Sequence, residues 1–226
     1  FIGGGSGVDI SESKFASSVG GENNDIITGN YSVIAGGKNN LISGEGSVAG
    51  FSSNVVGGGR DNSIKSSAAS VIAGGEGNTI TGFVSCIMGG VANRIDGEGY
   101  SIIGGGEANT TRGQFSAILG GENNKTSGHY AVVAGGNSSS ASGDYSFIGG
   151  GDQNHVSGEY SYAFGRKALV APTHSGAAVL ADGQNRTHTS SGEHTLNLDF
   201  ASGVYIGGGG ALYVSGNPVM TGAHTV

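Results

Sequence analysis

Short apolar runs alternate with turns rich in glycine and asparagine along most of the chain. Each run spans four or five residues, many of them β-branched, and a pair of glycines follows it. A stable helix needs about ten residues or more, so the pattern predicts strands rather than helices. We expect two short strands in each phrase, for example residues 145–148 and 154–157, joined by turns in which glycine adopts a positive φ.

One phrase of about fifteen residues recurs throughout residues 1–165 and reads aromatic-Ser-x-apolar-x-Gly-Gly-x-x-Asn-x-apolar-Ser-Gly-x. Copies aligned on the second glycine of each pair lie 14 to 16 residues apart, with a single step of 22 residues. The aligned glycines are Gly5, Gly21, Gly37, Gly59, Gly75, Gly90, Gly106, Gly121, Gly136, Gly151 and Gly165. Such repetition is typical of a solenoid, in which each repeat stacks on the next.

A repeat of this length with two strands predicts an all-β, two-sided β-solenoid (a β-roll) with one coil of about 15–16 residues per repeat. Coils lie about 4.8 Å apart, so about eleven coils form a rod about 50 Å long. We expect the rod to span residues 1–165, with an irregularity at 45–58. Residues 166–226 should then form a β cap and a thin C-terminal stalk segment.

Equivalent residues of successive coils lie above one another in such a stack, so each position of the phrase becomes a column. We expect the asparagine amides to form hydrogen bonds along the axis, and the serine hydroxyls to do likewise where a strand begins. The asparagine column contains Asn24, Asn40, Asn62, Asn78, Asn93, Asn109, Asn124 and Asn154, with Ser139 as a substitute. The serine column contains Ser32, Ser70, Ser85, Ser101, Ser116, Ser146 and Ser161. The aromatic column contains Phe15, Tyr31, Tyr100, Phe115, Tyr130, Tyr145 and Tyr160.

Two neighbouring apolar positions follow the serine, and this pair bears on the oligomeric state. Alternate residues of a strand point to opposite faces, so one position fills the coil and the other faces outward. The outward column and the aromatic side chains need a second surface, and the simplest one is another copy of the rod in register. We therefore expect a parallel homo-oligomer and favour a homotrimer, although the repeat does not set the number of chains. Residues expected to pack in the core or between chains are Ile34, Ile72, Ile103, Ile118, Val133 and Ile148.

The phrase is interrupted at two places. Residues 45–58 carry about six extra residues, which fit a surface loop or a register correction, or else a protruding contact loop. At Arg166 the phrase ends, and GRKALVAPTHSG brings the first proline, Pro172. Residues 194–200 then alternate between apolar and polar, which is typical of a strand. We expect a cap here, because the last coil of a solenoid otherwise exposes an unpaired edge.

Composition narrows the classes of partner. The 226 residues include 48 glycines and no tryptophan, and the formal net charge is -7. This charge argues against nucleic acid or an anionic membrane as the main partner, and the lack of an 18-residue apolar run argues against membrane insertion. Cys86 follows Ser85 in an apolar position, so we expect a small buried side chain. The phrase is already running at Phe1, so we expect a piece of a longer chain.

No constellation of catalytic residues stands out. The glycine runs lack the Gly-Lys-Ser/Thr of a phosphate loop and are expected to form turns. The acids that follow the glycine pairs should form a solvated stripe rather than a calcium site or a glycan-cleaving pair; they are Glu12, Glu22, Glu76, Glu107, Glu122 and Asp152. His188 and His194 are close enough in sequence to suggest an ion site in a trimer, but ordinary histidines are the simpler interpretation. We predict no enzyme activity, no metal and no cofactor.

The repeats resemble the β-roll heads of trimeric autotransporter adhesins. They are more similar still to glycine- and asparagine-rich repeats of phage tail fibres and related bacterial surface proteins, which close with the phrases matched here by YSYAFGRKA, HSGAAVLAD and ASGVYIGG. The likeness covers essentially the whole chain and implies a homotrimeric, elongated fibre segment that is virion-borne or extracellular. Many such fibres end in a self-cleaving chaperone, and this sequence contains no recognisable catalytic motif of such a chaperone.

Three functions follow from these considerations. The first is a structural and adhesive segment of a phage tail fibre, a rigid trimeric rod that spaces or presents host-receptor binding on the virion. Its partners would be its own copies, other fibre or virion proteins, and a host cell-surface glycan or protein. The second is the head of a bacterial trimeric surface adhesin, at the cell surface. The third is an ice-binding solenoid, which the absence of a repeated threonine column disfavours.

Overall fold

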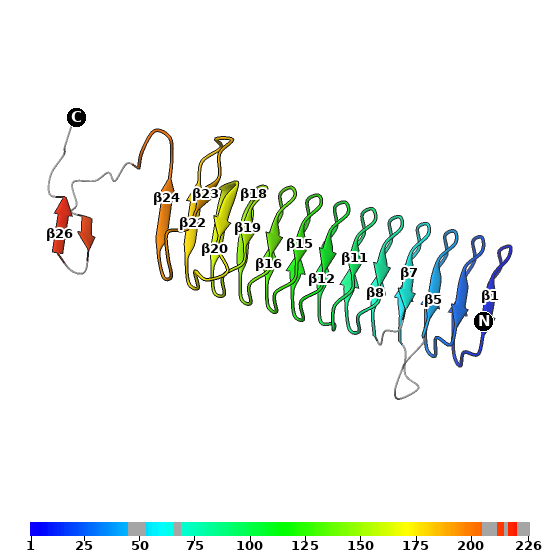
Figure 1. The fold of residues 1–226 in the computed structure, drawn as a ribbon. Coiled ribbons are helices and arrows are strands. Elements are labelled where there is room, and N and C mark those ends of the chain that lie inside the picture. The colour runs from blue at the N-terminus through cyan, green and yellow to red at the C-terminus, as the bar shows by residue number, and fades with distance from the viewer. Residues whose placement is uncertain (45–52, 66–68, 205–211, 215–216, 221–226) are drawn as a thin grey trace.

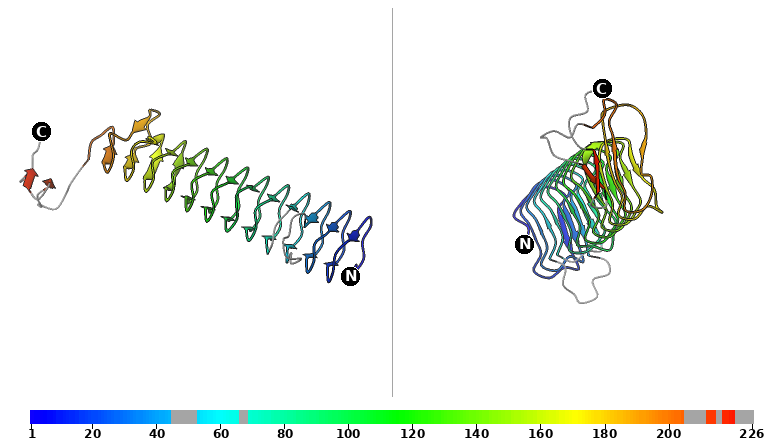
Figure 2. Two further views of the ribbon diagram at one scale, coloured as in Figure 1. Left: turned by 60° about the horizontal axis from the view of Figure 1, so that its bottom comes forward. Right: turned by 90° about the vertical axis from the view of Figure 1, so that its left-hand side faces the viewer.

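The computed structural model describes residues 1–44, 53–65, 69–204, 212–214 and 217–220 of the chain. Throughout these residues the structure is all-β and contains no helix. Figure 1 shows the turns of the chain following one another along a straight rod, and Figure 2 shows that the stack is flattened into two layers. The predicted β-solenoid, with its two short strands in each turn, is therefore confirmed.

Every turn contributes one strand to each of two parallel sheets, which have twelve strands each within the described residues. The first sheet consists of β1 (Asp9–Ser11), β3 (Asp25–Ile27), β5 (Leu41–Ser43), β7 (Ser63–Lys65), β9 (Thr79–Ile80), β11 (Arg94–Ile95), β13 (Thr110–Thr111), β15 (Lys125–Thr126), β17 (Ser140–Ala141), β19 (His155–Val156), β21 (Ala168–Val170) and β23 (His188–Thr189). The second sheet consists of β2 (Ser17–Ser18), β4 (Val33–Ile34), β6 (Val55–Val56), β8 (Val71–Ile72), β10 (Cys86–Ile87), β12 (Ile102–Ile103), β14 (Ala117–Ile118), β16 (Val132–Val133), β18 (Phe147–Asp152), β20 (Tyr162–Arg166), β22 (Ala178–Ala181) and β24 (Leu196–Asp199).

Neighbouring turns are in register, so equivalent residues pair with one another. In the second sheet Ile103 pairs with Ile87 on one side and with Ile118 on the other. The inward residues of both sheets meet between the layers and form one core that runs the length of the rod. Because this core is only two side chains thick, a small set of isoleucines, valines and alanines is enough to fill it.

Most strands have only two or three residues, and they begin later than the pattern suggests. The expected strand at 145–148 begins only at Phe147, and Tyr145 lies in the preceding turn with φ at +55°. All seven aromatic residues of the column have this left-handed conformation. The sequence pattern predicts a positive φ at glycines and not at aromatic residues. The assignment of Tyr145 to a strand was therefore wrong, because this residue lies in the turn. Gly106 (φ +89°) shows where glycine is required, because a Cβ there would collide with the carbonyl oxygen of Gly121 in the next turn.

The two sheets continue beyond the expected boundary at residue 165. β21 and β23 extend the first sheet, and β22 and β24 extend the second, up to Asp199. In β24 polar and apolar residues alternate, but the apolar side chains face outward instead of inward. Leu196 and Leu198 face outward and are 65% and 42% exposed, whereas Asn197 pairs with the buried Val179. The end of the repeated phrase is therefore not the end of the stacking, because backbone pairing needs no particular side chains.

Most of the irregularity expected at 45–58 lies outside the described residues. The stack is continuous across it, since Val33 and Ile34 of β4 pair with Val55 and Val56 of β6. Near the C-terminus, β25 (Leu212–Val214) and β26 (Asn217–Met220) form an antiparallel pair with each other.

Candidate functional site

The asparagine column forms a continuous network of buried amides. Asn62 Nδ2 donates to the carbonyl oxygen of Gly58 in its own turn (3.0 Å) and to that of Gly75 in the next turn (2.9 Å). Asn62 Oδ1 accepts the backbone N–H of Asn78 (3.0 Å) and also the Nδ2 of Asn78 (3.1 Å). The bonds to both carbonyls recur at Asn24, Asn40, Asn78, Asn93, Asn109, Asn124 and Asn154.

This network explains why the phrase couples a glycine pair to an asparagine. The amide holds the carbonyl oxygens of the glycine turn on both sides, so the turn and the asparagine form one unit. All eight asparagines are at most 1% exposed, and each has both its donors and its acceptor satisfied. The sequence predicts contacts between amides, but it does not reveal the bonds to glycine carbonyls. Ser139 continues the column by accepting the N–H of Asn154 (3.2 Å).

The serine column is less regular than the sequence suggests. Ser32, Ser101, Ser116, Ser146 and Ser161 are all buried. Ser32 Oγ accepts the N–H of Asn54 (3.2 Å), Asn54 Oδ1 accepts the N–H of Ser70 (3.0 Å), and Ser161 Oγ accepts the N–H of Ala177 (3.1 Å). The hydroxyl of Ser146, however, has no hydrogen-bond partner in the described part of the chain. Asn54 was missed, although it precedes its aligned glycine by five residues, as all serines of the column except Ser161 do.

The core residues predicted from the pattern all lie between the sheets. Ile34, Ile72, Ile103, Ile118, Val133 and Ile148 are fully buried. The second of the two apolar positions after the serine therefore points inward, and the first points outward. Cys86 occupies the first position and is only half-buried, so the expectation of a buried cysteine was wrong. Partial burial raises the pKa of its thiol.

The aromatic column forms a stack along one edge of the roll. Ring centroids of Tyr100, Phe115, Tyr130, Tyr145 and Tyr160 are 4.8 to 4.9 Å apart, with interplanar angles between 2° and 18°. The rings cover each other's faces, so part of the cover that the sequence assigns to a partner comes from the same chain. Their edges remain accessible, and the side chains are 41% to 53% exposed.

The outer face of the second sheet, which we call the apolar face, carries two apolar columns. One contains Val33, Val55, Val71, Cys86, Ile102, Ala117, Val132 and Phe147, which pair in register. The other contains Val19, Ala35, Gly57, Ala73, Met88, Gly104, Leu119, Ala134, Gly149 and Phe164. Neither column has a charged residue within the described strands β2 to β24.

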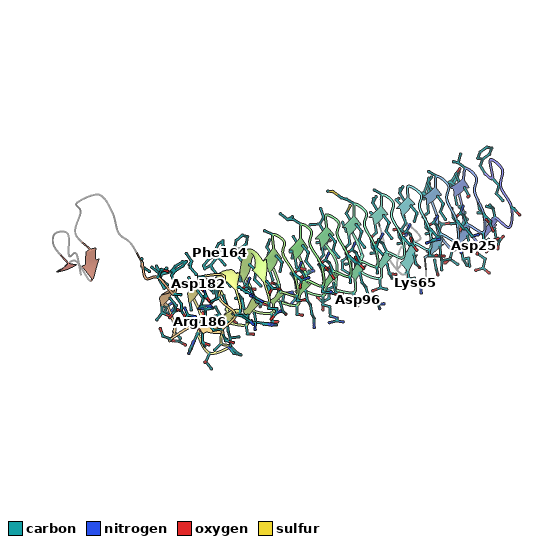
Figure 3. The ribbon with its side chains drawn as sticks, turned by 90° about the horizontal axis from the view of Figure 1, so that it is seen from above. Asp25, Lys65, Asp96, Phe164, Asp182 and Arg186 are labelled. Atoms are coloured by element: carbon teal, nitrogen blue, oxygen red, sulfur yellow. The ribbon has the colours of Figure 1, made fainter. Side chains whose placement is uncertain are left out.

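The outer face of the first sheet is polar by contrast, and we call it the polar face. From β3 to β19 the column through its strands contains one apolar residue, Leu41, beside Asp25, Ser63, Thr79, Arg94, Thr110, Lys125, Ser140 and His155. Figure 3 shows Phe164 on one side of the ribbon and Asp25, Lys65 and Asp96 on the other. The rod is therefore amphipathic across its thickness, as a sheet with one covered face is.

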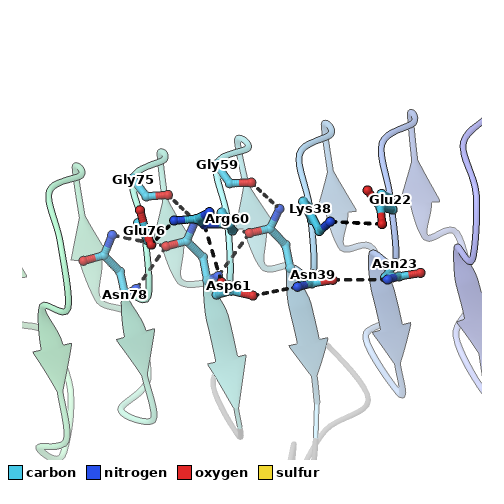
Figure 4. A network of polar contacts seen from close by, with 12 residues as sticks. Glu22, Asn23, Lys38, Asn39, Gly59, Arg60, Asp61, Gly75, Glu76 and Asn78 are labelled. Carbon is cyan, nitrogen blue, oxygen red and sulfur yellow. Dashed lines mark hydrogen bonds and ion pairs between the residues drawn. The ribbon is translucent and has the colours of Figure 1, made fainter.

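The acidic stripe expected after the glycine pairs also contains basic residues. Glu22, Lys38, Arg60 and Glu76 lie in successive turns of one column, and Lys38 Nζ is 3.0 Å from Glu22 Oε1. Arg60 forms an ion pair with Glu76 (Figure 4). The column continues through Glu107, Glu122 and Asp152, whereas Glu12 is not part of it. Because these pairs are exposed to solvent, they contribute little to the stability of the fold.

In the last described turns of the stack, a histidine and two aspartates take the place of the asparagine network. His188 occupies the asparagine column, since it pairs with Ala168, whose N–H donates to Asn154 Oδ1. The His188 ring is fully buried, with Nδ1 2.7 Å from Asp199 Oδ2 and Nε2 3.5 Å from Asp182 Oδ1. Backbone N–H groups of Ala201 and Gln184 hold the pKa of Asp182 below its usual value.

His194 lies in the aromatic column, because its N–H donates to the Ser175 carbonyl just as that of Tyr160 donates to Asp144. His188 and His194 therefore lie at opposite edges of the roll and do not form one site. Within the described ranges no group of three or more histidine, cysteine or acidic side chains is arranged to hold a metal ion.

None of the described segments is a helix of the length and hydrophobicity needed to span a bilayer. A comparison of the chain with models of known protein families finds no match, and a comparison with curated proteins finds none either.

Proposed function

We propose that the chain is a structural segment of a phage tail fibre, a rigid rod made of three parallel copies that spaces or presents host-receptor binding. The observation that carries the proposal is the apolar face, which follows a stiff, in-register stack and has no charged residue in its two columns between β2 and β24. A rod of this kind adds length without chemistry, and each turn contributes about 4.8 Å.

The size of the apolar face supports self-association. Twelve strands give it a length of about 50 Å, and two columns of side chains give it a width of about 13 Å, so its flat area is roughly 650 Å². Exposed apolar patches on monomeric proteins are about 300–600 Å², and a standard stable interface takes about 800 Å² from each partner. A second copy in register offers an equally long and equally apolar surface.

The assignment to a phage fibre rests on the resemblance of the repeats and of the closing phrases. The head of a bacterial trimeric adhesin would use the same rod, so the two proposals differ in location and not in architecture. An ice-binding role has less support, because Arg94 and Lys125 interrupt the column of Thr79 and Thr110 on the polar face.

The proposal is tested by electron microscopy with antibodies raised against the segment. We expect labelled fibres on virus particles and straight rods about 50 Å long for the isolated segment. Labelling of the bacterial envelope would select the adhesin, and compact globular particles would overturn the proposal of a rod.

A further inference from the structure

A small hollow lies at the C-terminal end of the polar face. It has a volume of about 280 Å³ and is lined by Gln153, His155, Lys167, Leu169 and Thr187. Ligand pockets for drug-sized molecules begin at about 300 Å³, so this hollow suits a smaller unit such as a single sugar ring.

Two columns of the stack build the hollow. His155 of β19 pairs with Leu169 of β21 along one column. Gln153 and Lys167 precede these strands and share the left-handed conformation, with φ at +57° and +53°. Thr187 lies beside Lys167 in the next turn, because His188 N–H donates to the Lys167 carbonyl (3.0 Å). The backbone thus fixes all five residues, although each comes from a short strand or a turn.

The charge of Lys167 is the notable feature of this hollow. Lys167 is half-buried, yet no ion pair or side-chain hydrogen bond engages its ammonium group within the described residues. Asp152 lies one turn away from Lys167 but forms an ion pair with Arg166, whose Nε is 3.1 Å from Asp152 Oδ2. Every described arginine of the rod has an acidic partner within 4.0 Å, whereas Lys167, like Lys14, Lys65 and Lys125, has no ion pair in the described structure.

We propose that the hollow binds a carboxylate-bearing sugar unit of a surface glycan, an inference that rests on the proposed role of the rod in host recognition. Lys167 would bind the carboxylate, and Gln153, Thr187 and His155 would form hydrogen bonds with ring hydroxyls. Leu169 supplies apolar surface for the C–H face of the ring. One fixed positive charge matches one carboxylate, since a doubly charged phosphate usually binds several cations or a helix N-terminus.

The aromatic stack does not compete for this role. Sugars pack against the faces of aromatic rings, and the faces of Tyr130 and Tyr145 are covered by each other at 4.8 Å. The hollow therefore offers what the stack lacks, namely a concave surface with polar side chains that have no hydrogen-bond or ion-pair partner among the described residues.

The test is ligand-observed NMR with the intact oligomer and four sodium salts or sugars, namely glucuronate, N-acetylneuraminate, acetate and glucose. We expect saturation transfer to at least one of the two acidic sugars, with a dissociation constant in the millimolar range for a single site. Glucose and acetate should bind at least tenfold more weakly, because each offers only half of the contacts. Equal binding of acetate would show that charge alone acts, and equal binding of glucose would show that Lys167 is not used. Either result, or no binding of both acidic sugars, would overturn the proposal.

Lys167→Gln should weaken binding about tenfold, the loss typical of one charge-assisted hydrogen bond. The substitution suits the fold, since Gln153 occupies the same column one turn earlier with the same backbone conformation. Lys125→Gln is the matched control, because Lys125 also lies on the polar face without an ion pair in the described structure but is outside the hollow. An equal loss in both variants would contradict a local site.

The outcome is separable from that of the proposed function. All five lining residues belong to one chain, so the hollow exists in a monomer as well as in a trimer. A trimer that binds neither acidic sugar would refute the hollow alone. A monomer that binds one of them would refute the trimeric rod and leave the hollow supported.

Discussion

Replacement of Asn109 by alanine is the sharpest perturbation of the asparagine column. The Asn109 amide donates to the carbonyl oxygens of Gly105 (3.1 Å) and Gly121 (2.8 Å), and its Oδ1 accepts the N–H of Asn124 (2.9 Å). Each lost bond costs about 1 kcal/mol, and a buried N–H without a partner costs about 1–3 kcal/mol. We therefore expect Asn109→Ala to lower the free energy of unfolding by about 3–5 kcal/mol.

The matched control is Asn123→Ala, which lies in the next turn of the stack, directly before Asn124 and in the left-handed column that precedes the asparagine column. Asn123 is exposed and bonds only to Glu122 (3.2 Å) among the side chains described, and Ala92 and Ala108 already occupy its column with φ at +55°. This change should lower the free energy of unfolding by only about 1 kcal/mol, because alanine is somewhat less favourable than asparagine in the left-handed conformation. Asn109→Ser should be intermediate, because Ser139 shows that serine can continue the column.

Chemical denaturation of the purified segment measures these differences, and amide hydrogen exchange locates them. Solenoid turns contact mainly their neighbours, so faster exchange in Asn109→Ala should be confined to the turns around β13. Equal destabilisation by Asn109→Ala and Asn123→Ala would refute the argument that the buried amides hold the glycine turns.

Three further expectations concern the surfaces and the end of the rod. Leu119→Lys places a charge on the apolar face, where Leu119 is 57% exposed in one chain, and should dissociate the oligomer; Ser127→Lys on the polar face should not, as light scattering can show. The Cys86 thiol should react with maleimide at least tenfold faster in that dissociated variant than in the wild-type oligomer, and equal rates would place Cys86 outside the interface. The depressed pKa of Asp182 means that its carboxylate stabilises the folded state above pH 4 and that this contribution is lost as pH falls through the folded pKa. Exchange of the Ala201 N–H, 2.6 Å from Asp182 Oδ2, should accelerate below pH 4 and become independent of pH in Asp182→Asn after correction for intrinsic exchange.

The architecture could be predicted from the sequence because one phrase recurs many times, so that its copies can be aligned with one another. The spacing of the glycines implies the turns, and the paired apolar residues at Val132 and Val133 imply one inward and one outward column. Strand pairing between equivalent residues follows directly, because parallel stacking places like on like.

The departures from the prediction have a common physical cause, which is that backbone geometry depends on contacts between turns. Tyr145 has a left-handed conformation in which its N–H donates to the backbone carbonyl oxygen of His129 in the neighbouring turn (2.8 Å). The local sequence does not reveal this contact between turns. Likewise, the stacking beyond Gly165 relies on backbone pairing, which leaves no mark on side-chain identity. The hollow at Lys167 combines residues from three turns at the end of the repeats. The repeated phrase stops there, so an alignment of the repeats does not show which residues lie next to one another.

The central claim is that the apolar face joins copies of the chain in solution, and the molar mass of the purified segment tests it most directly. One chain has a mass of 22.2 kDa, so size-exclusion chromatography with multi-angle light scattering should give about 67 kDa for three copies. Leu119→Lys should reduce this value toward that of one chain while the circular dichroism of the strands is retained. A wild-type mass of 22.2 kDa at micromolar concentration would contradict the account, because the apolar face would then be exposed to water without a partner.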